Sequence, residues 1–254
     1  MIPTSIHIGP LTFHLYGLVI ALAILAGWYL AKKRAYIYKI PKSLLEDPIL
    51  LLPLLLSIIG ARTYHVLDYW TVYDLNPISI IYIQNGGLGI WGALSGIFIG
   101  FVIIAKVKKV NLIHVLDLAA PSVLLGQTIG RIANYINREG FGPPTQLPWG
   151  VSIPPENRPI QYIKSTHFHP TFFYEAAIDF VFFLLLLNLS RKFKKPGQTF
   201  ALYLIFYSTG RFIVEFFRID TATVGTIKVA QVLSVVAFLA GIFIFIKNKG
   251  VDRA

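Results

Sequence analysis

The chain has 254 residues, of which 55% are hydrophobic and only 14% are charged, and it contains no cysteine. About a quarter of the residues of a soluble domain are normally charged, so this composition excludes an ordinary soluble domain and indicates a membrane protein. Without cysteine there is no disulfide framework, no thiolate metal site and no thiol nucleophile. The formal net charge of +11 would suggest nucleic-acid binding in a soluble chain, so the positions of the basic residues decide its meaning.

Seven segments are apolar and long enough to cross a bilayer, at about 20 residues per crossing. In chain order they cover residues 11–31, 48–67, 87–105, 113–134, 170–190, 199–218 and 227–247. The first lacks a preceding basic segment and a small-residue cleavage site, so we expect it to be retained rather than cleaved as a signal peptide. The sequence therefore predicts one domain, residues 1–254, that is an all-α integral membrane protein with seven transmembrane helices.

The basic residues alternate between loops, and this alternation predicts the orientation of the helices, because short cytoplasmic loops are enriched in Lys and Arg. Fifteen of the 23 basic residues follow the first, third, fifth and seventh spans: Lys32, Lys33, Arg34, Lys39, Lys42, Lys106, Lys108, Lys109, Arg191, Lys192, Lys194, Lys195, Lys247, Lys249 and Arg253. The loop from Asp68 to Asn85 has none. We expect an outside N-terminus, a cytoplasmic C-terminus, and basic segments that face anionic lipid rather than nucleic acid.

The connection at residues 135–169 is polar and rich in Pro and Gly, and the predicted orientation places it outside. Long loops without regular structure are uncommon unless they are functional, so we expect a small extracytoplasmic cap that either contacts substrate or merely connects two helices. His167 and His169 lie in this segment without a short-spaced carboxylate or Cys partner, so we expect no metal site.

Small residues recur every four positions in two spans. Gly92, Gly96 and Gly100 do so in the third span, and Gly126 and Gly130 in the fourth. In lipid such spacing lets helix backbones approach closely, so we expect tight helix packing at both places. The chain has no convincing internal repeat, which disfavours an inverted-repeat transporter.

Three arginines lie well inside predicted spans: Arg62, Arg131 and Arg211. A fourth, Arg218, is the last residue of the sixth span and shares a helical face with Arg211 and Glu215. A charged side chain at the bilayer centre costs about 2.5–3.5 kcal/mol on insertion scales and is normally retained for a partner or a pathway. Arg211 shares a helical face with Glu215, and Arg131 shares one with Asn134. These pairs could be purely structural, and for Arg62 a structural and a functional role remain equally open.

Two guanidinium groups from different helices, at comparable depth in the outer leaflet, could instead hold a phosphate. Arg presents a rigid, permanently charged fork of donors that matches phosphate oxygens. We therefore expect Arg131 and Arg211 to bind a lipid phosphate. Tyr16 and the polar groups of residues 169–175 lie at a similar predicted depth.

Residues 130–139, GRIANYINRE, resemble the G-R-x-x-N-[FY]-x-N-x-E signature of bacterial prolipoprotein diacylglyceryl transferases. The resemblance continues in the same order over nearly the whole chain, at residues 14–18, 60–64, 85–88, 117–121, 169–175 and 210–218. It implies a seven-span enzyme of the bacterial inner membrane. Such enzymes transfer the diacylglyceryl group of phosphatidylglycerol to the lipobox cysteine of a preprolipoprotein, next to its signal peptide, and release glycerol phosphate without a metal or cofactor.

The resemblance also implies functional residues, which are Tyr16, Arg131, Asn134, Glu139, Arg211 and Glu215. We expect the two arginines to hold the phosphate and to stabilise charge on the leaving group. Glu215 would position Arg211. Asn134 and Glu139 would orient Arg131 or the glycerol hydroxyls.

Further candidates complete the predicted site. Asn137 and Arg62 are additional candidates for binding substrate. The thiol proton could pass to His169, Tyr16, Glu139 or the leaving phosphate, and the sequence leaves these four open.

The chain departs from the family pattern at two places. Trp91 occupies the position of a histidine in the G-G-x-x-x-H-G-G run, and because a Trp side chain cannot act as a base, this position supplies no proton acceptor here. The run H-P-S-Q-x-Y-E reads His-Pro-Thr-Phe-Phe-Tyr-Glu at residues 169–175, so a Gln amide is lost. Two alternatives remain open: a lipid or small-anion transporter, and a non-catalytic homologue that binds lipid or lipoprotein precursors.

Overall fold

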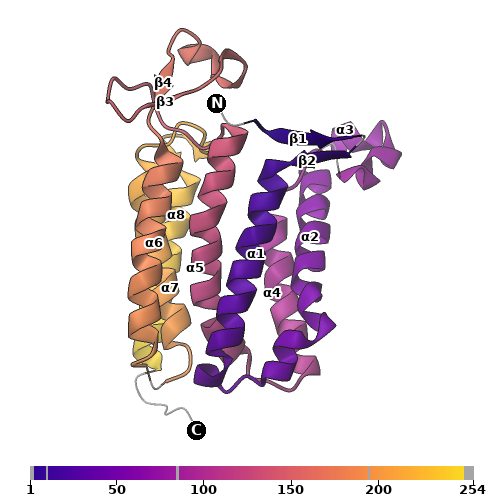
Figure 1. Cartoon of the computed structure of the whole chain (residues 1–254), viewed down its shortest axis with the longest axis vertical. Helices are drawn as coiled ribbons and strands as arrows, with labels where there is room; N and C mark the ends of the chain where they lie inside the picture. The colour runs from indigo at the N-terminus through magenta and orange to yellow at the C-terminus, as the bar shows by residue number, and fades with distance from the viewer. Residues whose placement is uncertain (1–2, 10, 84–85, 194, 249–254) are drawn as a thin grey trace. The chain divides into compact units, whose positions relative to one another are not determined.

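The computed structural model describes residues 3–9, 11–83, 86–193 and 195–248 (Figure 1). It forms two compact units, Met1–Arg34 with Asp117–Ala254 and Ala35–Leu116. Lys194, Lys249 and Arg253 of the predicted basic segments lie outside the described residues, as does Asn85.

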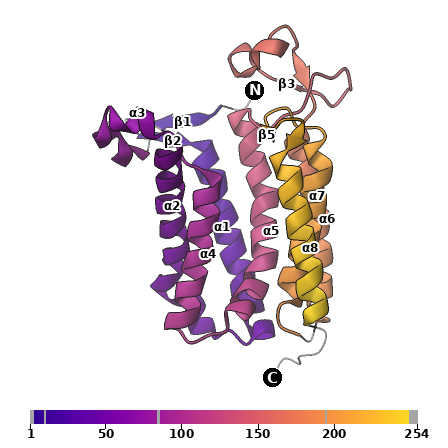
Figure 2. The same cartoon turned by 180° about the vertical axis from the view of Figure 1, so that it is seen from behind.

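The first unit is a bundle of long helices. They are α1 (Leu15–Arg34), most of α5 (Leu112–Asn137), α6 (Thr171–Ser190), α7 (Gln198–Glu215) and α8 (Val229–Lys247). Within this unit the helices lie side by side and successive helices run in opposite directions (Figures 1 and 2). The end of α5, the start of α6 and the end of α7 therefore meet at one end of the bundle.

Apolar side chains hold this bundle together. Leu124 of α5 and Leu186 of α6 are completely buried in a cluster that also includes Phe183. Asp117, buried in α5, accepts hydrogen bonds from the backbone N–H groups of Gly197 and Phe200 at 2.7 and 2.8 Å. These bonds satisfy donors that the first turn of α7 leaves unpaired, and they fix where that helix begins.

Residues 138–170 form a small folded segment at the end of the bundle where α6 begins (Figure 1). It contains the antiparallel strands β3 (Val151–Ser152) and β4 (His167–Phe168) and the 3₁₀ turns η6 (Pro155–Asn157) and η7 (Ile160–Tyr162). Phe141, Ile153 and Phe168 form a buried cluster with Phe172 from the first turn of α6. The segment predicted to be a connector or a cap thus packs through a hydrophobic core against the start of α6.

The structure is mostly helical, as predicted, and two further short hairpins lie outside the long helices. β1 (Ser5–Ile8) pairs with β2 (Leu11–His14), and β5 (Thr223–Val224) pairs with β6 (Ile227–Lys228), both antiparallel. The helices predicted to begin at residues 11 and 227 therefore begin at Leu15 and Val229. Apolar composition set those predicted limits, but it cannot tell a strand outside the helix from the first turn of the helix.

The second unit contains a close helix pair, α2 (Leu52–Asp68) and α4 (Ile90–Val107). Its shorter elements are η1 (Ala35–Tyr38), η2 (Lys42–Glu46), η3 (Pro48–Leu51), α3 (Trp70–Asp74) and η4 (Pro77–Ile81). A Cβ atom at Gly92 would lie 1.9 Å from the carbonyl oxygen of Gly60, and one at Gly96 would lie 2.0 Å from that of Leu56. The predicted close packing along α4 is confirmed.

The same prediction is wrong for α5. A Cβ atom at Gly126 would meet no atom within 4 Å among the described residues, and one at Gly130 would meet only the end of the Ile20 side chain, at 4.0 Å. Spacing alone cannot show whether another helix backbone lies opposite a glycine.

Within the part of the chain that the structure describes, six helical segments are long and apolar enough to span a membrane: Leu15–Tyr38, Pro48–Asp68, Ile90–Val107, Leu112–Asn137, Thr171–Ser190 and Val229–Lys247. They correspond to six of the seven predicted spans, and the chain is a multi-pass membrane protein. The remaining predicted span, residues 199–218, coincides with α7. This helix includes the charged side chains of Arg211 and Glu215 and is not among the six.

The α2–α4 contact predicts a selective effect of adding one methyl group. Gly96→Ala should lower the free energy of unfolding by about 1–3 kcal/mol, because the new Cβ would collide with the backbone of α2. Gly126→Ala is the matched control and should not destabilise the protein, because the space around Gly126 is open. Unfolding in mixed micelles measures both variants. Equal stability of the two would contradict the close contact.

Candidate functional site

The carboxylate of Glu175, on the first turns of α6, is the centre of a charged cluster. The residue is 1% exposed. Arg131 of α5 donates a hydrogen bond from Nη2 to Oε1 of Glu175. Nη1 of Arg211, on α7, lies 3.4 Å from Oε2, and Nη1 of Arg218, just beyond α7, lies 3.6 Å from the same oxygen. Three guanidinium groups thus surround one buried carboxylate.

The helix ends explain how these residues meet. Arg131 lies six residues before the end of α5, Arg211 four before the end of α7, and Glu175 four after the start of α6. Because α5 and α7 run opposite to α6, these positions lie at a similar level of the bundle (Figure 1). The sequence reasoning predicted this shared depth for the two arginines.

A second buried carboxylate holds Arg211. Oε2 of Glu215, one helical turn after Arg211, lies 2.8 Å from Nη2 of Arg211, and Glu215 is completely buried. Thr221 donates a hydrogen bond to the other carboxylate oxygen of Glu215. Lys228 donates to the backbone oxygens of Glu215 and Arg218 at 2.5 and 2.9 Å. These contacts fix the end of α7 and, with it, the direction of the Arg211 side chain.

A polar chain holds Arg131 from the other side. Nη1 of Arg131 donates to Oδ1 of Asn134 at 3.0 Å, and Nδ2 of Asn134 donates to Oε1 of Glu139 at 2.9 Å. Glu139 itself is exposed. Asn134 and Glu139 thus form a hydrogen-bonded chain that runs from Arg131 to the surface.

Ion pairs with buried carboxylates hold the guanidinium groups of the cluster. Three guanidiniums contact two of them, Glu175 and Glu215, and a third buried carboxyl group, that of Asp179, acts on Arg131 and Arg211 through its charge. Asp220, which accepts a hydrogen bond from Arg218 at 2.9 Å, is 43% exposed and therefore better screened by water. The side chains of Arg131 and Arg211 retain 19% and 18% exposure. An anion can therefore approach guanidinium groups that are already oriented.

The other residues of the first unit that the sequence predicts to be functional lie near this cluster or in the 138–170 segment. Tyr16, on the first turn of α1, is half-buried, and the charges of Glu139 and Arg131 act on its hydroxyl. His169 lies in the 138–170 segment, with Nδ1 3.1 Å from the hydroxyl of Tyr174. Asn137, the last residue of α5, is exposed.

Arg62 belongs to the second unit and has a structural environment. Its Nε donates to the carbonyl oxygen of Ile80 at 2.8 Å, and Nη1 donates to those of Gly86 and Gly87 at 2.7 and 3.0 Å. Nη2 donates to the carbonyl oxygen of Ser79. These bonds occupy the guanidinium with the loop after α2, which favours the structural interpretation that the sequence left open.

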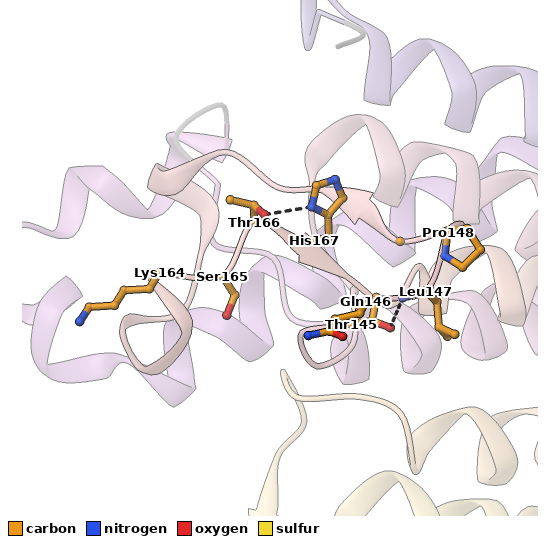
Figure 3. A pocket seen from close by; sticks show the side chains of 9 residues that line it. Thr145, Gln146, Leu147, Pro148, Lys164, Ser165, Thr166 and His167 are labelled. Carbon is orange, nitrogen blue, oxygen red and sulfur yellow. Dashed lines mark hydrogen bonds between the residues drawn. The ribbon is translucent and has the colours of Figure 1, made fainter.

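A pocket of about 510 Å³ lies within the 138–170 segment (Figure 3). Its polar lining includes Thr145, Lys164 and His167, and Nδ1 of His167 lies 2.9 Å from the hydroxyl of Thr166. None of the residues predicted to be functional lines it. Among the described residues, no three His, Asp or Glu side chains gather as metal ligands would.

Sequence reasoning missed Glu175 as a site residue, and it noted Arg218 only as a member of the helical face of Arg211. Both follow from the rule that drew attention to the arginines, because an ionisable residue within or next to a span is normally retained for a partner. Asp179, one turn further along α6 and 1% exposed, was missed in the same way.

A family model described as prolipoprotein diacylglyceryl transferase matches residues 3–247. The chain belongs to the prolipoprotein diacylglyceryl transferase family. The signature expected from the sequence, residues 130–139, covers the end of α5 and supplies Arg131, Asn134 and Glu139 to the cluster.

Relatives from distant bacteria are similar over most of their length. Each is named phosphatidylglycerol–prolipoprotein diacylglyceryl transferase. The Nostoc sp. protein is 40% identical over 250 residues, which cover 94% of this chain and 87% of the relative. The Staphylococcus haemolyticus protein is 38% identical, with 97% and 88% covered, and the Clostridium novyi protein is 37% identical, with 98% and 96% covered.

The structure places both departures from the family pattern. Trp91 lies on the first turn of α4 in the second unit and is 43% exposed. Phe172, in place of the family's Gln, is 1% exposed and packs in the core of the 138–170 segment. The preceding Thr171 donates a hydrogen bond to the carbonyl oxygen of Gly140. The side chain that replaces the amide therefore stabilises this segment against α6.

Removing the negative charge of Glu175 should have a large effect on stability. Glu175→Gln leaves three guanidiniums around a neutral amide and should cost about 3–5 kcal/mol, as expected when one partner of a buried ion pair is removed. Glu156→Gln is the control, because Glu156 lies 3.6 Å from Arg138 but its side chain is 68% exposed. We expect that change to cost about 0–1 kcal/mol in the same unfolding measurement. Similar losses in both variants would contradict the central role of Glu175.

Proposed function

We propose that this protein transfers the diacylglyceryl group of phosphatidylglycerol to the lipobox cysteine of prolipoproteins and releases glycerol phosphate, the first step of lipoprotein maturation. The observation that carries the proposal is the cluster of Arg131, Arg211 and Arg218 around Glu175 at one end of a membrane helix bundle. Membership of the family and the names of the relatives support the same reaction.

Arg131 and Arg211 bind the lipid phosphate in this proposal. They come from different helices, share Glu175 as a partner and remain partly exposed. Their guanidinium planes are fixed before substrate arrives, Arg131 by Asn134 and Arg211 by Glu215. Donors that are oriented in advance stabilise developing charge without reorganising, which is the usual source of electrostatic catalysis.

The chemistry is a displacement at carbon. The sulfur of the substrate cysteine attacks the glyceryl carbon that carries the phosphate, so that a C–S bond forms and the C–O bond breaks. The electron pair of the C–O bond leaves with glycerol phosphate, whose negative charge increases next to the two arginines. The thiol must lose its proton, because the thiolate is the nucleophile and a free cysteine thiol, with a pKa of about 8.5, is mostly protonated at neutral pH.

We further propose seven transmembrane helices in the bacterial inner membrane, with the N-terminus outside and the C-terminus cytoplasmic. Within the first unit, Lys32, Lys33, Arg34, Arg191, Lys192 and Lys247 lie at the end opposite to the arginine cluster. By the distribution of basic residues, that end faces the cytoplasm. The 138–170 segment is then the extracytoplasmic cap, and α7 crosses the membrane between α6 and α8.

The phosphate-binding role predicts that charge alone is insufficient at either arginine. Arg131→Lys and Arg211→Lys, made singly, keep the positive charge but lose the planar fork. Each should lower the rate of glycerol phosphate release by about 100- to 1,000-fold, the usual effect of removing one such donor. The assay uses purified protein, phosphatidylglycerol and a lipobox peptide. Arg191→Lys, at the opposite end of α6, is the control and should retain the wild-type rate.

Near-wild-type release by Arg131→Lys or Arg211→Lys would contradict the proposed phosphate site.

The topology can be tested with single cysteines, because the native chain has none. We expect a membrane-impermeant thiol reagent outside the cytoplasmic membrane to label Lys164→Cys and Val224→Cys. Lys192→Cys should be labelled only after that membrane is permeabilised. Val224 and Lys192 lie beyond opposite ends of α7. Labelling of both from the same side would show that α7 does not cross.

A further inference from the structure

Asp179 is a buried carboxyl group that the phosphate site does not use. It lies on α6 one helical turn after Glu175, towards the middle of the helix, and is 1% exposed. Among the described residues, neither of its carboxyl oxygens has a hydrogen-bond partner. Burying such a group without a donor is costly, so its retention within a membrane helix indicates a function.

The surroundings of Asp179 join it to the arginine cluster. The charges of Glu175, Arg131 and Arg211 act on its carboxyl group. Glu175 is already engaged by its guanidinium partners, whereas Asp179 has no direct partner in the described part of the chain. Asp179 is therefore the carboxyl group of this cluster whose oxygens are available to a new donor.

In the described residues, no polar group of the neighbouring helices donates a hydrogen bond to Asp179. On α7, Tyr203 and Tyr207 lie close enough to be affected by the charge of Asp179. On α5, Nε2 of Gln127 donates to the hydroxyl of Tyr203 at 3.2 Å, and Oε1 of Gln127 is buried without a partner in the described residues. The interior between α5, α6 and α7 thus contains acceptors without a partner in the described residues, the carboxyl oxygens of Asp179 and Oε1 of Gln127. It also contains one such donor, Nε of Arg131, which is not bonded to Asp179.

The stereochemistry of the proposed reaction places the substrate thiol on the same side of the bound phosphate as Asp179. With the phosphate on Arg131 and Arg211, the acyl chains must lie in the hydrocarbon, so the attacked carbon lies on the membrane side of the phosphate. Displacement at carbon requires the sulfur to approach opposite to the leaving oxygen, which is further in that direction. Asp179 is about 6 Å beyond Glu175 along α6, because four residues of helix rise 1.5 Å each.

We propose that Asp179 accepts the proton of the substrate cysteine. This inference rests on the transferase activity proposed above. The S–H bond breaks as the C–S bond forms, the proton passes to a carboxylate oxygen of Asp179, and the electrons of the C–O bond leave with glycerol phosphate. His169 and Glu139 lie on the other side of the arginines, towards the 138–170 segment, and Trp91 cannot act as a base.

The test compares two peptides that differ only in the nucleophile. Wild-type protein and Asp179→Asn are assayed for glycerol phosphate release from phosphatidylglycerol, with a cysteine lipobox peptide and with its selenocysteine analogue under reducing conditions. The selenol is already ionised at neutral pH and needs no base. With cysteine, kcat of Asp179→Asn should fall about 100-fold or more, as expected for loss of a general base. With selenocysteine it should remain close to wild type.

Each outcome distinguishes one role from another. Equal losses with the two peptides would show a structural role and overturn the proposal, as would an unchanged rate with cysteine. The KM for phosphatidylglycerol should not change, because Asp179 does not hold the phosphate. Failure of the wild-type protein to release glycerol phosphate with either peptide would instead refute the transferase function itself.

Two further variants control for folding. Ser234→Ala removes another buried polar side chain of the bundle, on α8, and should retain both activities. Asp179→Glu keeps a carboxyl group and should restore most of the activity with cysteine, with a shifted pH profile. If Asp179→Asn does not fold, the pH profile of Asp179→Glu tests the proposal instead. A profile unchanged from that of the wild type would contradict proton transfer to residue 179.

Discussion

The structure of the first unit depends on the burial of one negative charge, the carboxylate of Glu175. A carboxylate this far from water is stable only when cations and hydrogen-bond donors surround it. Here the partners come from two other helices, since Arg131 is on α5 and Arg211 is on α7. One buried group therefore fixes the ends of three helices relative to one another and orients the side chains that we propose bind the lipid phosphate.

The same arrangement explains how positive charge can be present in a membrane bundle before substrate arrives. Glu175 and Glu215 offset part of the charge of the arginines, and the exposed Asp220 and Glu139 extend the network to the surface. Arg131 and Arg211 remain partly exposed, and their donors are suited to a single phosphate diester. The absence of cysteine from the chain is consistent with the proposed reaction, because the only thiol that this reaction requires belongs to the substrate.

The sequence predicted much of this architecture. Length and hydropathy located six spans that the structure contains, and helical periodicity correctly paired Arg211 with Glu215 and Arg131 with Asn134. Periodicity acts within one helix, however, and cannot show which side chain a neighbouring helix supplies. Glu175 was missed as the common partner for this reason, and the open space at Gly126 could not be distinguished from the tight contact at Gly96.

The central claim is that Arg131 and Arg211 together hold the phosphate of phosphatidylglycerol. The most direct measurement is an experimental structure of the protein in lipid nanodiscs that contain phosphatidylglycerol. The account predicts a lipid phosphate within hydrogen-bond distance of both guanidinium groups, with the acyl chains directed along α6 towards the membrane interior. A head group bound elsewhere, with both arginines still occupied only by Glu175, Glu215 and Asn134, would contradict it.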